Sequence, residues 1–160
     1  MIRYLGFFSL LFFMCSCSKN TKDVDVSESV VSVDMRRLDL EMSQCNSAEE
    51  VETVLARHPA LVSSFVQYGI MPNLKVMSFE FWKLISSGQE LFSAVGNELS
   101  EVDDIELELE DAFKHFKHYD NNFKEPVLYW IISGYGGFAV DAKDSTVVII
   151  GSEYFLDDKV

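Results

Sequence analysis

The stretch Thr146-Val-Val-Ile-Ile-Gly151 most constrains the fold of this chain. Its apolar residues follow one another without interruption, which is typical of a strand covered on both faces of a sheet. Residues 127–133, Val-Leu-Tyr-Trp-Ile-Ile-Ser, predict another strand. The glycines of 134–137 indicate a hairpin turn that leads into a short strand at 138–142. The carboxyl-terminal part of the chain is therefore predicted to form a small sheet.

Before this sheet the sequence predicts helices. One begins after Ser47, which can cap it, and Glu50 completes a capping box. The longest is predicted over 101–119 with Ser100 as its cap, and its apolar face consists of Val102, Ile105, Leu109, Ala112, Phe113 and Phe116. The other predicted elements are a first strand at 30–40 and short helices at 48–57, 61–68, 78–86 and 89–95. We therefore expect an α+β domain in which several short helices and one long amphipathic helix are followed by a small sheet.

The amino terminus has the features of a signal peptide. Arg3 supplies a positive charge, and residues 5–14 are apolar apart from Ser9. This segment is about half as long as a helix that crosses a bilayer. It therefore predicts a cleaved signal peptide over 1–16.

Cys15 and Cys17 directly follow the apolar segment. A small residue before a cysteine at this place resembles the lipobox of bacterial lipoproteins, in which the chain is cut before the cysteine and acyl chains such as palmitate are attached to it. Ser16 precedes Cys17 whereas Met14 precedes Cys15, so Cys17 is the predicted lipidation site. Two alternatives stay open: a secretory signal with incidental cysteines, and a Cys-x-Cys metal site, which would need further ligands. Cys45 is then the remaining cysteine, and we expect a buried or half-buried thiol.

The predicted mature part is strongly acidic. Without Arg3 it has 12 Lys and Arg against 26 Asp and Glu, a net charge of −14. Nucleic-acid binding is therefore not expected, because phosphate binding requires the opposite sign, and attachment to a membrane is expected to come from the acyl chains. Residues 17–29 are polar and predict a lipidated flexible tether before a domain over 30–160.

The sequence contains partial matches to enzyme and metal-site motifs, but none of them predicts a catalytic or metal site. Residues 134–139 match G-x-G-x-x-G/A, but the helix that this nucleotide motif requires has no room before the next strand. His115 and His118 are three apart on the long predicted helix, away from its apolar face and beside lysines, which favours solvated histidines. His58 precedes a proline and predicts a cap or turn residue. We therefore expect no enzyme, no metal, no cofactor and no small-molecule substrate.

Several motifs occur in a family-like order. Asp34-Met-Arg-Arg-Leu-Asp39 and Arg57-His-Pro59 come first, residues 107–119 read LELEDAFKHFKHY, and residues 144–156 read DSTVVIIGSEYFL. Together they resemble the motifs I-x-R-F-D, x-Y-P, L-x-x-L-F-K-H-I-K-Y-Y and D-T-L-L-L-I-G-L-D-x-Y-L-G of the gliding-motility-associated lipoprotein B family (GldB-like). The resemblance covers about 31–157 and includes Pro126-Val-Leu128 and Ile132-Ser-Gly134. The chain departs from it at Leu38 (Phe in the family), at Ser152-Glu153 (Leu-Asp) and at Asp157 (Gly).

The resemblance implies a lipid-anchored protein of the bacterial cell envelope, in the outer rather than the inner membrane. It implies a non-enzymatic scaffold or partner-binding role in gliding motility, with envelope or gliding-machinery proteins as partners. It also implies a fold similar to the amino-terminal half of zincins, and a domain cut short at its carboxyl end, because the family continues with a helical half. Two alternatives are the amino-terminal part of a membrane-anchored zincin-like metallopeptidase whose metal motif lies beyond residue 160, and a binding module for a small envelope ligand.

Aromatic residues gather in the predicted sheet region. They are Tyr129, Trp130, Tyr135 and Phe138. We predict that they form a surface for a protein partner, although aromatic residues at such spacing are more often part of a core.

Overall fold

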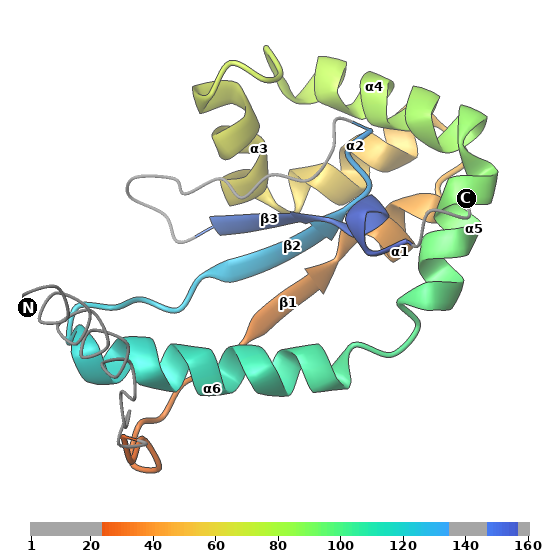
Figure 1. Ribbon diagram of the computed structural model, residues 1–160. Coiled ribbons are helices and arrows are strands. Elements are labelled where there is room, and N and C mark those ends of the chain that lie inside the picture. Colours follow the sequence, from red (N-terminus) through yellow and green to blue (C-terminus); the bar gives the residue numbers. More distant parts are fainter. Residues whose placement is uncertain (1–23, 135–146, 157–160) are drawn as a thin grey trace, which may run out of the picture.

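The computed structural model describes residues 24–134 and 147–156. Within these ranges the chain forms six α-helices, a sheet of three strands and one 3-10 helix (Figure 1). In chain order they are β1 (Asp34–Arg37), α1 (Leu38–Ser43), α2 (Ala48–Ala56), α3 (Pro59–Gln67), α4 (Leu74–Ser87), α5 (Gln89–Glu98), α6 (Asp103–Tyr119), β2 (Val127–Ile131), β3 (Val147–Gly151) and η1 (Ser152–Phe155). The predicted α+β class is confirmed.

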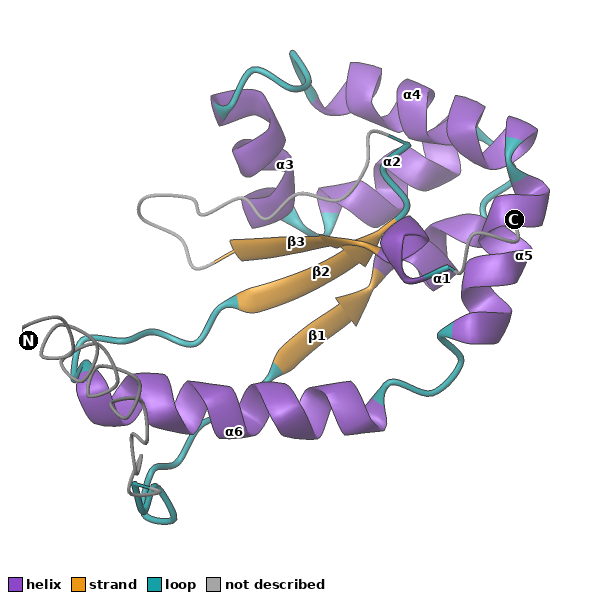
Figure 2. Ribbon diagram, viewed as in Figure 1, coloured by secondary structure: helices purple, strands orange, loops and turns teal. Residues whose placement is uncertain are grey.

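The sheet is parallel, which the sequence did not predict. β2 lies between β1 and β3 and is parallel to both (Figure 2). Because both edges of β2 are hydrogen-bonded, the predicted hairpin between β2 and a strand at 138–142 is wrong. Gly134 does have the positive φ of a turn glycine, 69°. Residues 138–142 themselves lie outside the described residues.

The first strand is shorter than predicted. β1 ends at Arg37, and the residues expected to continue it, 38–40, begin α1 instead. Leu38 and Met42 are one helical turn apart and are 1% and 0% exposed, whereas Leu40 is 36% exposed. The spacing of four that buries Leu38 and Met42 therefore prevailed over the apparent alternation of Leu38 and Leu40. Since β1 belongs to the sheet, the helices do not precede the sheet but connect β1 to β2, as a parallel pair requires.

The helix ends show which local signals were read correctly. The Ser47 side chain accepts a hydrogen bond from the Glu50 amide at 3.2 Å, so the predicted cap of α2 is confirmed. Pro59 begins α3 rather than ending α2, which suits a residue without an amide hydrogen. Asn73 caps α4 through the Val76 amide at 3.0 Å, a signal that the sequence analysis missed.

Two predictions about the long helices need correction. α6 starts at Asp103 after Val102, without a side-chain cap, so Ser100 does not have the predicted role. α4 has 14 residues and α6 has 17, so α6 is not the single long helix.

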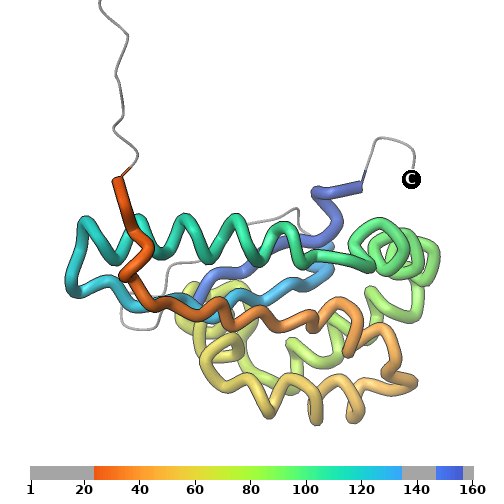
Figure 3. Tube along the Cα trace, turned by 90° about the horizontal axis from the view of Figure 1, so that it is seen from below, coloured from red at the N-terminus to blue at the C-terminus, as the bar shows by residue number. Residues whose placement is uncertain are grey.

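The sheet is covered on both faces, with α2 and α3 on one side and α6 on the other (Figure 3). The Tyr129 ring lies edge-on against His58, the residue before α3. Tyr129 is the register partner of Ile149 in β3, so both side chains are on the α3 side of the sheet. Trp130 and its partners Arg37 and Ile150 are on the opposite face, because alternate residues of a strand point to opposite sides. The largest fully buried side chains are Trp130, Phe65, Leu38, Met42, Leu55, Leu61, Met77, Leu128, Ile131, Ile132, Ile149 and Val51.

The described part of the predicted tether lies against the domain. Val26 is 8% exposed, and its carbonyl accepts from the Ser29 amide at 2.9 Å. The Lys117 Nζ of α6 donates to the Val30 carbonyl at 2.9 Å. Val26 is therefore packed against the described domain, while the rest of the tether before residue 24 and the signal peptide lie outside the described residues.

Candidate functional site

The carboxyl ends of the three strands meet at one edge of the sheet, the place where open α/β sheets usually bind their ligands. Polar residues follow each strand there: Arg37 ends β1, Ser133 follows β2, and Ser152 and Glu153 follow β3. These residues come from three of the motifs that the sequence analysis quoted separately. The fold therefore brings the segments 34–39, 132–134 and 151–156 together, and we call the place where they meet the carboxyl edge.

The centre of the carboxyl edge is a buried ion pair. Asp39 is 1% exposed. Its Oδ1 accepts from the Arg37 Nε at 2.9 Å, and its Oδ2 accepts from the Arg37 Nη2 at 2.9 Å and from the Ser152 hydroxyl at 2.9 Å. A buried carboxylate is costly unless it is paired, and here both oxygens are bonded. The contact joins the end of β1 to the start of η1.

Arg37 has further contacts that hold its guanidinium in place. Its Nη1 donates to the Leu99 carbonyl at 2.6 Å, which ties the end of α5 to the sheet. Its Cζ lies 5.6 Å from the centre of the Trp130 ring, a cation–π distance. The Arg37 side chain thus links β1, β2, α5 and η1.

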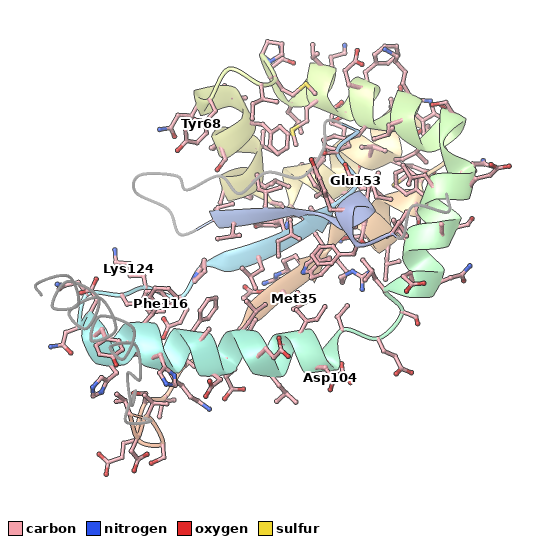
Figure 4. All side chains as sticks on the ribbon, in the orientation of Figure 1. Met35, Tyr68, Asp104, Phe116, Lys124 and Glu153 are labelled. Atoms are coloured by element: carbon pink, nitrogen blue, oxygen red, sulfur yellow. The ribbon has the colours of Figure 1, made fainter. Side chains whose placement is uncertain are left out.

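A second carboxylate binds the chain just after β2. The Glu153 Oε1 accepts from the Ser133 amide at 3.0 Å, the Ser133 hydroxyl at 2.7 Å and the Gly134 amide at 3.0 Å. Figure 4 shows Glu153 at the end of β3, close to the carboxyl end of the sheet. The other oxygen, Oε2, is buried and has no hydrogen-bond partner within the described ranges, and the same holds for the Trp130 Nε1. Glu153 therefore fixes the exit of β2 to the exit of β3.

A cavity of about 320 Å³ opens beside β1 and α1. Its lining includes Arg36, Arg37, Arg57, His58 and Glu41. Each arginine is paired with a carboxylate, because Arg36 contacts Asp34 and Arg57 contacts Glu41 as Arg37 contacts Asp39. These arginines are all of those in the chain apart from Arg3. The cavity is therefore polar but close to charge balance.

His58 borders that cavity with a half-buried ring. It occupies the position before α3, as predicted, but its side chain makes no capping bond. The Nε2 is 4.0 Å from a Glu41 oxygen, and the ring lies 5.4 Å from the Tyr129 ring. Burial lowers the pKa of His58, with Arg36 and Arg57 acting in the same direction and Glu41 opposing them. Its surroundings therefore favour the neutral imidazole.

Cys45 is the free cysteine of the described chain and is half-buried, as expected. It lines a cavity of about 620 Å³ between α1, α4 and α5. Burial raises the pKa of its thiol, and the nearby Glu50 and Glu41 add to the effect. These surroundings favour the thiol over the thiolate, which is the reactive form.

The predicted aromatic surface is not present as such. Tyr129 is 5% exposed and Trp130 is 0% exposed, so these two residues belong to the core and offer no surface to a partner. The physical reason is that β2 is the central strand and both of its faces are covered. Tyr135 and Phe138 lie outside the described residues, and their role stays a prediction.

The histidines of α6 are solvated, as predicted. The His115 Nδ1 lies 3.0 Å from the Asp111 carbonyl, and its side chain is 40% exposed. His118 is exposed and lies edge-on to Tyr119. In the part of the chain that the structure describes, no group of His, Cys, Asp and Glu side chains could hold a metal ion.

The first glycine of the glycine motif, Gly134, binds a carboxylate of the chain itself. In a nucleotide loop, the backbone amides after the strand are used for phosphate. Here the Ser133 and Gly134 amides donate to Glu153. The rest of the motif, 135–139, and the predicted lipidation site Cys17 lie outside the described residues.

Sequence reasoning missed the residues of the carboxyl edge. Arg37 and Asp39 were quoted as part of a motif, and Glu153 as a departure from one, without a role. A signal was available, because polar residues that directly follow buried parallel strands meet at the same edge. It could not be used while the strands were taken as a hairpin.

Among the described residues, none of the helices has both the length and the apolar character needed to cross a membrane.

Comparisons with known proteins give one match. No curated protein and no solved structure matches the chain, so the likeness to zincins stays a prediction. The GldB lipoprotein family model, described as "Gliding motility protein GldB", matches residues 19–160. The match spans most of the chain and all three segments of the carboxyl edge, and the chain belongs to the family of gliding motility protein GldB.

Proposed function

We propose that this protein is a lipid-anchored component of the bacterial cell envelope that supports gliding motility by binding other envelope proteins. Membership of the GldB family places it among gliding-motility-associated proteins. The observation that carries the anchor is the sequence Ser16-Cys17 directly after the apolar residues 5–14. The family match begins at residue 19, so it covers the part that would remain after cleavage before Cys17. Three acyl chains on Cys17 would hold the protein on a membrane, for which we propose the outer membrane.

A non-enzymatic role is supported by how the carboxyl edge uses its polar groups. A catalytic group needs a reactive atom beside a place that a substrate can enter. Here both oxygens of Asp39 accept hydrogen bonds from Arg37 and Ser152, and one oxygen of Glu153 accepts hydrogen bonds from the chain after β2. These groups hold strands and helices together. The role that suits such a rigid edge is a scaffold for partners, and no described feature favours the metallopeptidase or the small-ligand module.

The anchor can be tested in cells by metabolic labelling. With an alkyne fatty acid in the medium, the unaltered protein is expected to take up the label. Cys17→Ala should abolish labelling and release the protein from membranes. Cys15→Ala is the matched control, because it removes the neighbouring cysteine and keeps the predicted lipidation site. Label retained in Cys17→Ala, or lost only in Cys15→Ala, would overturn the assignment.

A further inference from the structure

The chain enters the folded domain beside the carboxyl-terminal half of α6. Val30 is held there by the hydrogen bond from the Lys117 Nζ to its carbonyl at 2.9 Å. The views of Figure 1 and Figure 3 agree that the first described segment runs alongside this half of the helix. An anchor at Cys17 is therefore connected to the domain beside this half of α6.

Exposed aromatic and apolar side chains gather at the same place. Phe116 is 59% exposed, Tyr119 is 72% exposed and Val30 is 83% exposed. The Phe116 ring stacks on Phe123, with ring centres 5.5 Å apart and planes at 18°, and Lys124 follows in the exposed loop. We call these five residues the aromatic end of α6. Large exposed rings are uncommon on a surface that faces only water and are enriched where proteins contact the interface of a bilayer.

The charges of α6 are separated along its length. The first two turns and the middle carry Asp103, Asp104, Glu106, Glu108, Glu110 and Asp111, whereas Lys114 and Lys117 lie in the second half. Figure 4 shows the separation, with Asp104 at one end of the helix and Phe116 and Lys124 near the other. The acidic end is repelled by anionic lipid head groups. At the other end, Lys114 and Lys117 are paired with Glu110 and Glu125, so this end carries less uncompensated negative charge.

The length of the tether places the two ends of α6 at different distances from an anchor at Cys17. Eight residues lie between Cys17 and Val26, so even a fully extended chain places these two residues at most about 32 Å apart. The 17 residues of α6 make a helix about 25 Å long. An anchor at Cys17 therefore keeps the nearer end of α6 close to the bilayer, while the acidic end stays farther away.

We propose that the aromatic end of α6 rests in the interface of the lipid bilayer, with Phe116 and Tyr119 among the head groups and the acidic end of α6 turned away. This inference rests on the proposed anchor at Cys17. It adds an orientation, in which the carboxyl edge of the sheet, at the opposite end of β1, is held away from the membrane.

The test uses the acylated protein in vesicles of phosphatidylethanolamine and phosphatidylglycerol that contain nitroxide-labelled lipids. A Cys45→Ala background leaves one reactive thiol for a fluorophore, since Cys17 is acylated. Fluorophores are placed at Tyr119→Cys and, in a second variant, at Lys124→Cys. The second variant keeps every aromatic ring of this end of α6. The matched controls are Leu107→Cys, 64% exposed at the acidic end of α6, and Phe79→Cys, 53% exposed on α4.

We expect the lipids to quench fluorophores at 119 and 124 at least about twofold more than those at 107 and 79, as for groups inserted at the boundary of head groups and acyl chains. Equal quenching at all four positions, with protein that floats with the vesicles, would overturn the orientation and leave the anchor intact. Acylated protein that does not float with the vesicles would overturn the anchor and the orientation together.

Discussion

The two faces of the sheet are covered in different ways. On the face toward α2 and α3, Val147 and Ile149 are each 2% exposed. On the face toward α6, Val148 and Ile150 of the same strand are half-buried, and α6 itself has one buried residue, Phe113. At the carboxyl end of this second face, the Arg37–Asp39–Ser152 network lies beside the fully buried Trp130. An amphipathic pattern thus predicts a helix and its inward face, but not how deeply that face is buried.

The largest effect is expected from breaking the polar network. Asp39→Ala leaves the Arg37 guanidinium partly buried without its carboxylate, and we expect a loss of about 3–5 kcal/mol in the free energy of unfolding. Urea unfolding of the domain measures it. Ser152→Ala, which removes one hydroxyl donor and keeps the ion pair, is the matched control and should cost less, about 1.5–2 kcal/mol. If both variants cost about the same, the ion pair does not hold the second face together.

Neighbouring isoleucines of β3 compare the two faces directly. Ile149→Ala should cost about 3–4 kcal/mol, because it opens a cavity among fully buried side chains. Ile150→Ala makes the same chemical change on the α6 side and should cost about half as much, since its side chain is already partly in water. Both values come from the same unfolding experiment. Equal losses would mean that α6 packs on the sheet as closely as α2 and α3 do.

A smaller effect is expected at the exit of β2. Glu153→Gln keeps the shape of the side chain and an acceptor oxygen but removes the charge that strengthens three hydrogen bonds. We expect a loss of about 1–2 kcal/mol, together with faster hydrogen exchange of the Ser133 and Gly134 amides. Exchange that is unchanged at both amides would show that Glu153 does not hold them. Glu125→Gln, at an exposed ion pair with Lys117, serves as a control with little expected effect.

The smallest effect is expected in the pH dependence of the free energy of unfolding, at His58 on the face toward α2 and α3. Burial lowers the pKa of His58 in the folded state. The unfolded chain then binds a proton at a higher pH than the folded chain, so His58 lowers stability as the pH falls through the unfolded pKa, about 6.5. His58→Gln should make the free energy of unfolding fall less steeply between about pH 7.5 and 5.5. An identical slope in both proteins would contradict this assignment.

Local signals predicted the elements better than their arrangement. Ser47 and Glu50 fixed the start of α2, and the uninterrupted apolar run at 147–151 predicted a covered strand. The carboxyl edge was not predictable from the same signals, because it depends on β1 pairing in parallel with β2 across the whole helical segment. The burial of Tyr129 and Trp130 was missed for the same reason: the position of a strand in the middle of a sheet is set by partners far away in the sequence.

The most direct measurement is the mass of the amino-terminal peptide of the mature protein, taken from the membranes of its native host. We expect a peptide that begins at Cys17 and carries a diacylglyceryl group on sulfur and an acyl chain on the amino group. A mature protein that begins elsewhere, or that carries an unmodified Cys17, would contradict the lipid anchor and the orientation that depends on it.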